Sequence, residues 1–176
     1  MRIIAGRWGG RRLRPPRGSL VRPTTDRIRE AWMSAVQPRL PGASVVDICA
    51  GSGALGLEAL SRGAEKVTFV ERSATSLAAL RANIEALGAG DETRVLRANA
   101  IDYVKGLEAG SFDLALADPP YERGLATRIA EAYIEKPFAT ELWIEHSRRE
   151  TLPETPGGHT RRYGDTLLTT LTGDHV

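Results

Sequence analysis

The sequence has little of what disulfide-rich, metal-dependent or membrane-spanning proteins require. It holds one cysteine in 176 residues, so no internal disulfide can form. Its three histidines are scattered near the C-terminus without the spacing of a zinc site, so we expect no metal. No stretch approaches the roughly 18 apolar residues of a membrane span, and the first residues lack the apolar core of a signal peptide. We therefore expect a soluble cytoplasmic protein, and we expect it to be a monomer.

Positive charge is concentrated at one end of the chain. Residues 1–40 carry ten arginines and two acidic residues, whereas the remainder has 14 Lys and Arg against 20 Asp and Glu. Trp8 and several glycines are interleaved with these arginines, a pattern typical of nucleic-acid binding. The arginines that we expect to neutralise phosphates here are Arg7, Arg11, Arg12 and Arg14. A solvated basic tail is the alternative, because 21 arginines against 3 lysines can also reflect genomic base composition.

Beyond residue 41, short β-branched runs alternate with longer helical segments, which predicts parallel βαβ units. We expect strands at 44–49, 66–71, 93–98, 112–118 and 142–146. We expect helices at 26–36, 53–62, 74–87, 100–107 and 124–135. Glycine and proline pairs predict an extended arm or short hairpin before them, and Gly164-Asp165 predicts a closing hairpin over 160–171. The pattern predicts an α/β, doubly wound, Rossmann-like sheet, mostly parallel with an antiparallel C-terminal edge.

A glycine-rich turn follows the first expected strand. Residues 51–56 match the G-x-G-x-x-G fingerprint, in which Gly51 and Gly53 let the backbone approach a ligand. Glu71 stands twenty residues after Gly51, at the end of the next strand, where a carboxylate can accept hydrogen bonds from two ribose hydroxyls. The fingerprint alone does not choose the nucleotide, and a nicotinamide cofactor is an alternative.

Asp47, at the end of the same strand, favours one cofactor. A carboxylate there repels a pyrophosphate but attracts the ammonium and sulfonium of S-adenosyl-L-methionine. Asn99 and Ala100 follow the third strand, so we expect Asn99 or its neighbouring backbone to contact the purine amine. Cys49 is interpreted as a small buried hydrophobe and receives no chemistry. S-adenosyl-L-methionine is therefore the expected cofactor.

The segment Asp118-Pro119-Pro120-Tyr121 follows an apolar run and predicts methyl transfer to a nucleobase amine. Such an amine is a poor nucleophile, so its hydrogens must be bound and its lone pair aimed at the methyl donor. The Asp118 carboxylate and the Pro119 carbonyl, held rigid by two prolines, can accept those hydrogens. Tyr121 can stack on a base that has left its helix. A strand-ending turn is the alternative.

These residues resemble the bacterial 16S ribosomal RNA guanine-N2 methyltransferases of the RsmD type. The likeness rests mainly on three segments, which are RPTTDRIRE at 22–30, DICAGSGALGLEA with SRGA at 47–64, and the Asp-Pro-Pro-Tyr motif at 118–121. That motif alone also occurs in adenine-N6 and cytosine-N4 DNA methyltransferases. The opening residues 2–6 and the closing residues 163–166 are similar to the family as well. Cys49 and Tyr121 are small departures, because Phe often stands at the first position and in some members at the second.

The resemblance implies a class I S-adenosylmethionine-dependent fold and methylation of a guanine N2 amine in 16S rRNA, within an assembled or assembling small subunit. It implies that residues 1–40 contact RNA and that residues 41–176 form the methyltransferase domain. Thr24, Arg27 and Arg29 lie in the first of these segments, which we expect to fold over the pocket, with Arg27 and Arg29 touching RNA and Thr24 the methionine end of the cofactor. A capped helix with solvated arginines is the alternative for this segment. A DNA amine methyltransferase and a non-enzymatic rRNA-binding assembly factor are the alternatives.

Overall fold

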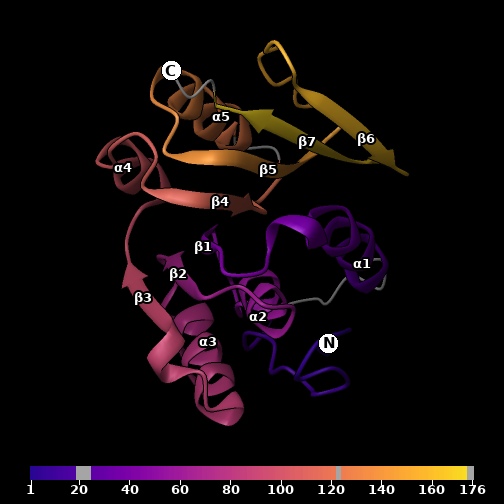
Figure 1. The fold of residues 1–176 in the computed structure, drawn as a ribbon, viewed down its shortest axis with the longest axis vertical. Helices are drawn as coiled ribbons and strands as arrows, with labels where there is room; N and C mark the ends of the chain where they lie inside the picture. Colours follow the sequence, from indigo (N-terminus) through magenta and orange to yellow (C-terminus); the bar gives the residue numbers. More distant parts are fainter. Residues whose placement is uncertain (19–24, 122–123, 174–176) are drawn as a thin grey trace.

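The computed structural model describes residues 1–18, 25–121 and 124–173, built around a seven-stranded sheet (Figure 1). The strands lie in the order β3-β2-β1-β4-β5-β7-β6. Their bounds are β1 Ser44–Ile48, β2 Lys66–Glu71, β3 Thr93–Arg97, β4 Phe112–Ala117, β5 Ala139–Ser147, β6 His159–Tyr163 and β7 Thr166–Thr172. The first five strands run parallel, whereas β7 is antiparallel to both β5 and β6. The predicted doubly wound sheet with an antiparallel C-terminal edge is confirmed.

Helices cover both faces of the sheet (Figure 1). They are α1 Thr25–Val36, α2 Ala54–Ser61, α3 Ala74–Leu87, α4 Ala100–Lys105 and α5 Leu125–Glu135, with short 3-10 turns at Gln37–Arg39 and Gly90–Glu92. Apolar residues of α1, α2 and α3 pack in one core cluster, and those of α4 and α5 pack in a second. The two clusters lie on opposite faces of the sheet.

Successive side chains of the central strands point to opposite faces of the sheet and so contribute to both clusters. In β4, Leu114 and Leu116 belong to the first cluster, whereas Ala115 and Ala117 belong to the second. All four side chains are at most 1% exposed. A parallel strand buried on both faces is apolar throughout, as the sequence of β4 is from Leu114 onward.

The predicted elements match the observed ones to within a few residues. The largest difference is β5, which begins at Ala139 rather than at Leu142. Ala139 pairs with Phe112 at the start of β4, and this tertiary pairing extends the strand through Ala139 and Glu141, two residue types that are depleted in strands. The predicted C-terminal hairpin is confirmed, with Gly164 in the left-handed region at φ 64°.

Residues 1–13 form a short hairpin, called here the N-terminal hairpin. Ile3 N–H donates to the Arg11 carbonyl at 2.9 Å, and Leu13 N–H donates to the Met1 carbonyl at 2.9 Å. The Ile3 and Leu13 side chains are buried in the same cluster as α2 and α3. The basic segment therefore packs into the core of the fold, beside α2 and α3 (Figure 1).

Over residues 1–18, 25–121 and 124–173, the structure has neither a membrane-spanning helix nor a cluster of metal-ligating side chains. None of the helices in these residues combines the length and apolar character needed to cross a bilayer. Within the same residues, no group of three His, Cys, Asp or Glu side chains is arranged to hold a metal ion.

Candidate active site

A cavity of about 640 Å³ lies at the carboxyl ends of the parallel strands. The structure brings seven of the predicted site residues to its wall, namely Gly51, Glu71, Asn99, Ala100, Asp118, Pro119 and Tyr121. They come from the ends of β1, β2, β3 and β4, the edge at which open α/β sheets bind their ligands. Thr24, also predicted to touch the cofactor, lies outside the described residues.

The glycines of the fingerprint have different tasks. Gly51 has φ 57°, and a Cβ there meets no atom within 4 Å, so it is open to the cavity that it lines. At Gly53, φ is 86° and a Cβ would lie 2.3 Å from Leu80 Cδ1 of α3. At Gly56, a Cβ would lie 2.4 Å from the Phe69 ring. Gly51 thus leaves room for a ligand, whereas Gly53, predicted to bind cofactor, is not on the cavity wall and packs α2 closely against its neighbours.

Glu71 links the glycine loop to the end of β2. Its Oε2 accepts from Gly51 N–H at 2.8 Å, and its Oε1 accepts from the N–H groups of Arg72 and Ser73 at 2.8 Å each. A carboxylate has about four acceptor positions, so these three bonds fix its orientation and leave capacity for a ligand hydroxyl. This geometry suits the predicted ribose contact.

Asp47 lies beneath the loop, not on the cavity wall. Its Oδ2 accepts from Gly56 N–H in the first turn of α2 at 3.0 Å, and the residue is 1% exposed. Its Oδ1 is buried and has no hydrogen-bond partner among the described residues. Burial, with a smaller contribution from the Glu71 charge, raises the pKa of Asp47 from 3.8 to about 7, although the Gly56 hydrogen bond opposes this. Asp47 therefore supports the loop from below and places an unsatisfied acceptor there.

Asn99 is the N-cap of α4. Its Oδ1 accepts from Ile101 N–H at 2.9 Å and from Asp102 N–H at 3.1 Å. The side-chain oxygen is thus engaged by the helix, so of the two options that the sequence left open, the backbone beside Asn99 is the better candidate for a purine. Ala100 begins the helix at this point and lines the cavity.

The Asp-Pro-Pro-Tyr segment forms the wall beyond β4. Asp118 is exposed and Pro119 is buried, and both line the cavity. The Tyr121 hydroxyl lies 2.8 Å from Glu145 Oε1 and 2.8 Å from Thr166 Oγ1. Glu145 and Thr166 also line the cavity and were missed as site residues. Thr166 belonged to a segment of family resemblance, whereas nothing in the local sequence distinguished Glu145.

The N-terminal segment contributes to the same cavity, through residues that the sequence did not single out as site residues. Met1, Pro15, Pro16 and Ile28 line it. Asn83 of α3 connects this segment to the glycine loop, because its Oδ1 accepts from Arg14 N–H at 2.7 Å and its Nδ2 donates to the Arg14 carbonyl at 2.9 Å and the Ser52 carbonyl at 3.0 Å.

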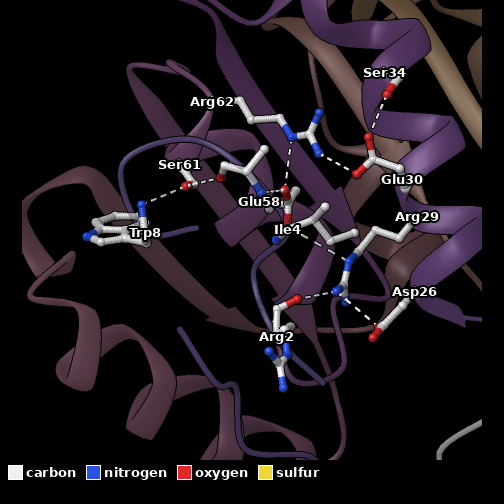
Figure 2. Close-up of polar contacts among 12 residues, drawn as sticks. Arg2, Ile4, Trp8, Asp26, Arg29, Glu30, Ser34, Glu58, Ser61 and Arg62 are labelled. Atoms are coloured by element: carbon white, nitrogen blue, oxygen red, sulfur yellow. Dashed lines mark hydrogen bonds and ion pairs between the residues drawn. The ribbon is translucent and has the colours of Figure 1, made fainter. Parts of the chain in front are cut away.

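Glu58 of α2 binds the backbone of the N-terminal hairpin through its carboxylate (Figure 2). The Ile4 N–H donates to Oε2 at 2.9 Å and the Ala5 N–H to Oε1 at 3.0 Å. Arg62 Nε donates to Oε1 at 2.9 Å, and Arg29 Nε lies 4.0 Å from Oε2. The side chain of Glu58 is fully buried, so these donors replace water around its charge.

The prediction that Arg29 touches RNA is wrong for this structure. Arg29 is 2% exposed, donates to the Arg2 carbonyl and pairs with Asp26 at 3.2 Å (Figure 2). Burial lowers the pKa of its guanidinium, while Asp26 and Glu58 oppose that change. The helical pattern of α1 places this arginine on the inner face beside Glu58, a partner 29 residues away that local sequence does not reveal.

The other predicted RNA contacts lie on the surface: Arg7, Arg11, Arg12, Arg14 and Arg27 are exposed. Arg7 pairs with Glu92 at 2.6 Å and lies over the Trp8 ring at 4.0 Å, and Arg11 donates to the Ala86 carbonyl at 2.7 Å. Such exposed contacts are weak and exchange readily for phosphate. Their role in RNA binding stays a prediction.

Cys49 follows β1 in the left-handed region, at φ 62°, and lines the cavity. Burial and the nearby carboxylates of Glu71 and Asp47 raise the pKa of its thiol to about 12. The thiol is therefore protonated at neutral pH, consistent with the expectation that it performs no nucleophilic chemistry.

Comparison with known proteins gives consistent matches along the chain. The family described as conserved hypothetical protein 95 matches residues 1–171. Ribosomal RNA small subunit methyltransferase D of Escherichia coli strain K12 is 35% identical over 159 residues, which are 89% of this chain and 79% of that protein. A solved Escherichia coli structure named as the methyltransferase yhhF superposes with TM-score 0.83 at 33% identity, covering 97% of this chain and 96% of that one. The 16S rRNA N2 methyltransferase RsmC of Thermus thermophilus, solved with AdoMet and guanosine, shares the fold at TM-score 0.69 and 20% identity, over 89% of this chain and 44% of its own.

Proposed function

Because the chain belongs to the RsmD-type family of ribosomal RNA small subunit methyltransferases, we propose that it transfers a methyl group from S-adenosylmethionine to the N2 amine of a guanine in 16S rRNA. One observation carries this proposal. The glycine loop with Glu71 and the Asp-Pro-Pro-Tyr segment line a single cavity, so a methyl donor and a target amine can meet there. Methyl transfer needs that juxtaposition.

The residues present fit the methyl donor. Glu71 is oriented for ribose hydroxyls, Gly51 leaves open space, and the backbone at Ala100 is placed for the purine. Asp47 supplies negative charge under the loop for a cationic ligand, although its buried position favours action through the loop over direct contact. When bound, S-adenosylmethionine would supply an electrophilic methyl group, whose bond to the sulfonium sulfur breaks to leave S-adenosylhomocysteine.

The chain's own residues then prepare the amine. The guanine leaves its stack and lies against Tyr121, where stacking contributes about 1–3 kcal/mol. The Asp118 carboxylate and the Pro119 carbonyl accept the two N2 hydrogens and aim the nitrogen lone pair at the methyl carbon. Positive charge develops on the nitrogen as the bond forms, and Asp118 stabilises it. The proton then passes to Asp118 or to water.

The exposed arginines of the N-terminal hairpin supply phosphate contacts for the RNA, in an assembled or assembling small subunit. Glu58 holds the same hairpin, and Pro15 and Pro16, which follow it in the chain, line the cavity. RNA that contacts these arginines and follows the segment to Pro15 and Pro16 can therefore reach the site where its base reacts. Each lost phosphate contact weakens binding and reduces its salt dependence.

The first experiment measures transfer of a labelled methyl group to small subunits that lack the modification, followed by nucleoside analysis of the RNA. Recovery of N2-methylguanosine supports donor, acceptor and reaction together. Transfer to duplex DNA but not to subunits contradicts the RNA substrate, and no transfer to any form of subunit revives the assembly-factor alternative.

Asp118→Ala tests the assignment of the catalytic carboxylate. We expect loss of turnover by at least about a hundredfold, with binding of S-adenosylhomocysteine within about threefold of the unaltered protein. Asp118→Asn is the matched variant, since it keeps the shape and one acceptor. Loss of donor affinity in both variants assigns Asp118 to the cofactor instead.

A further inference from the structure

Three side chains from separate segments meet through the hydroxyl of Tyr121. Tyr121 lies in the loop after β4, Glu145 lies in β5, and Thr166 is the first residue of β7. The Tyr121 hydroxyl donates to Glu145 Oε1 at 2.8 Å, and the Thr166 hydroxyl lies 2.8 Å from the same phenol oxygen. All three residues line the cavity that holds Asp118.

The chemistry of the groups fixes the direction of these bonds. A carboxylate only accepts, so the single hydrogen of the phenol is directed to Glu145. The Thr166 hydroxyl must then be the donor to the phenol oxygen. Burial, together with the Glu145 charge, raises the pKa of Tyr121, so the phenol keeps its hydrogen at neutral pH and the chain from Thr166 through Tyr121 to Glu145 persists.

The sheet holds the two outer members of this chain in place. Glu145 pairs with Leu168 across the β5–β7 ladder, and Ser147 pairs with Thr166. Because side chains two positions apart on a strand share a face, Glu145 and Thr166 are diagonal neighbours on one face. Thr166 is 9% exposed and follows directly after the Gly164 turn. The phenol oxygen is therefore bound at two points of a rigid antiparallel edge.

We propose that Glu145 and Thr166 are positioning residues that fix the Tyr121 ring by its hydroxyl, so that the ring is oriented for the target base before the base arrives. This inference rests on the proposed function, in which the base stacks on Tyr121. A ring bound only at its Cβ end loses orientational freedom when the base stacks, whereas a ring also bound at its hydroxyl has lost it on folding. Fixing the ring therefore improves placement of the base and leaves binding of the methyl donor unchanged.

The test is a cycle of Tyr121→Phe, Thr166→Val and the double variant, measured by methyl transfer to small subunits. Each single variant should lower kcat/KM by roughly tenfold, because a hydrogen bond to a charged or charge-linked group is lost. The double variant should be no worse than Tyr121→Phe, since both changes break the same chain. Thr166→Ser should restore most of the activity, and S-adenosylhomocysteine binding should stay within about twofold throughout.

Thr160→Val is the matched control. It removes the hydroxyl that lies 2.8 Å from Thr169 Oγ1 within the same C-terminal hairpin, and Thr169 keeps its bond to His146. Its kcat/KM should be unchanged. Equal loss in Thr160→Val and Thr166→Val assigns the effect to hairpin stability and overturns the proposal.

Tyr121→Ala separates failure of this inference from failure of the proposed function. If Tyr121→Phe is fully active and Tyr121→Ala is inactive, stacking stands and the positioning role of the hydroxyl is overturned. If Tyr121→Ala is fully active, stacking on Tyr121 is itself wrong. Absence of transfer by the unaltered protein contradicts the proposed function before any variant is compared.

Discussion

Two buried carboxylates, Glu58 within α2 and Asp47 in β1 beneath the first turn of that helix, differ in how their charge is satisfied. Glu58, fully buried, accepts from two backbone N–H groups of the N-terminal hairpin and from Arg62, with Arg29 4.0 Å away. Asp47, 1% exposed, accepts one hydrogen bond from Gly56, and its Oδ1 has no partner among the described residues.

The difference separates a carboxylate that the fold satisfies from one that, under the proposed function, is completed by a ligand. Burying a charge costs several kcal/mol unless donors replace its water. Around Glu58 the fold supplies those donors, so its charge joins the hairpin to α2. Beneath the glycine loop the fold leaves Asp47 incomplete, which is expected where a cationic ligand completes the electrostatics.

The largest expected effect is that of Glu58→Ala on stability. The change leaves two hairpin N–H groups and Arg62 Nε without their acceptor and removes the negative charge beside the buried guanidinium of Arg29, so the free energy of unfolding should fall by about 3–5 kcal/mol. Urea denaturation measures it. Glu30→Gln is the control, because Glu30 also pairs with Arg62 but its side chain is 45% exposed, and it should cost less than about 1 kcal/mol. Equal losses in both variants would contradict the structural role of Glu58.

Asp47→Asn should have the opposite effect, leaving stability intact and weakening ligand binding. The amide keeps the shape and one acceptor for Gly56 while removing a charge that burial disfavours, so the unfolding free energy near pH 8 should be unchanged or higher, to within about 1 kcal/mol. Calorimetry should show S-adenosylhomocysteine, which keeps the ammonium group, binding roughly tenfold more weakly. A stability loss as large as that of Glu58→Ala would place Asp47 with the structural carboxylates.

The pH dependence follows from the raised pKa of Asp47, which moves from 3.8 to about 7. Between these values the folded state binds a proton that the unfolded state does not. The stabilisation from this group is therefore complete below about pH 4 and is lost as the pH rises towards about 7. Binding of a cationic ligand should strengthen over the same rise, because it favours the ionised form. The unfolding free energy and the ligand affinity are measured as a function of pH for the unaltered protein and for Asp47→Asn. The differences between the two proteins give the contribution of Asp47 to each pH dependence, and identical curves would show that Asp47 does not titrate here.

Sequence predicted the sheet and most of the cavity because both depend on local pattern. Strand periodicity and the glycine fingerprint are encoded within a few residues, and strand ends meet at one edge of a parallel sheet. What was missed depends on partners distant in sequence. Arg29 is buried because Glu58 lies beside it, and Tyr121 contacts Thr166, 45 residues later, only through the antiparallel edge. A basic residue in a basic segment looks exposed until its acidic partner is placed.

Glu71→Gln should have only a small effect on stability and sharpens the comparison, because Glu71 is intermediate between the two carboxylates. It accepts three N–H groups from its own loop and also lines the cavity. Glutamine keeps an acceptor at one oxygen position but presents a donor at the other, opposite an N–H group that then lacks a partner. Since the site is partly exposed, water compensates, and the unfolding free energy should fall by about 1 kcal/mol in urea denaturation.

The affinity for S-adenosylhomocysteine should fall more, by roughly tenfold, because the ribose contact needs the carboxylate orientation that these N–H groups fix. If stability falls by several kcal/mol and affinity changes little, Glu71 belongs with Glu58 as a carboxylate whose donors all come from the fold.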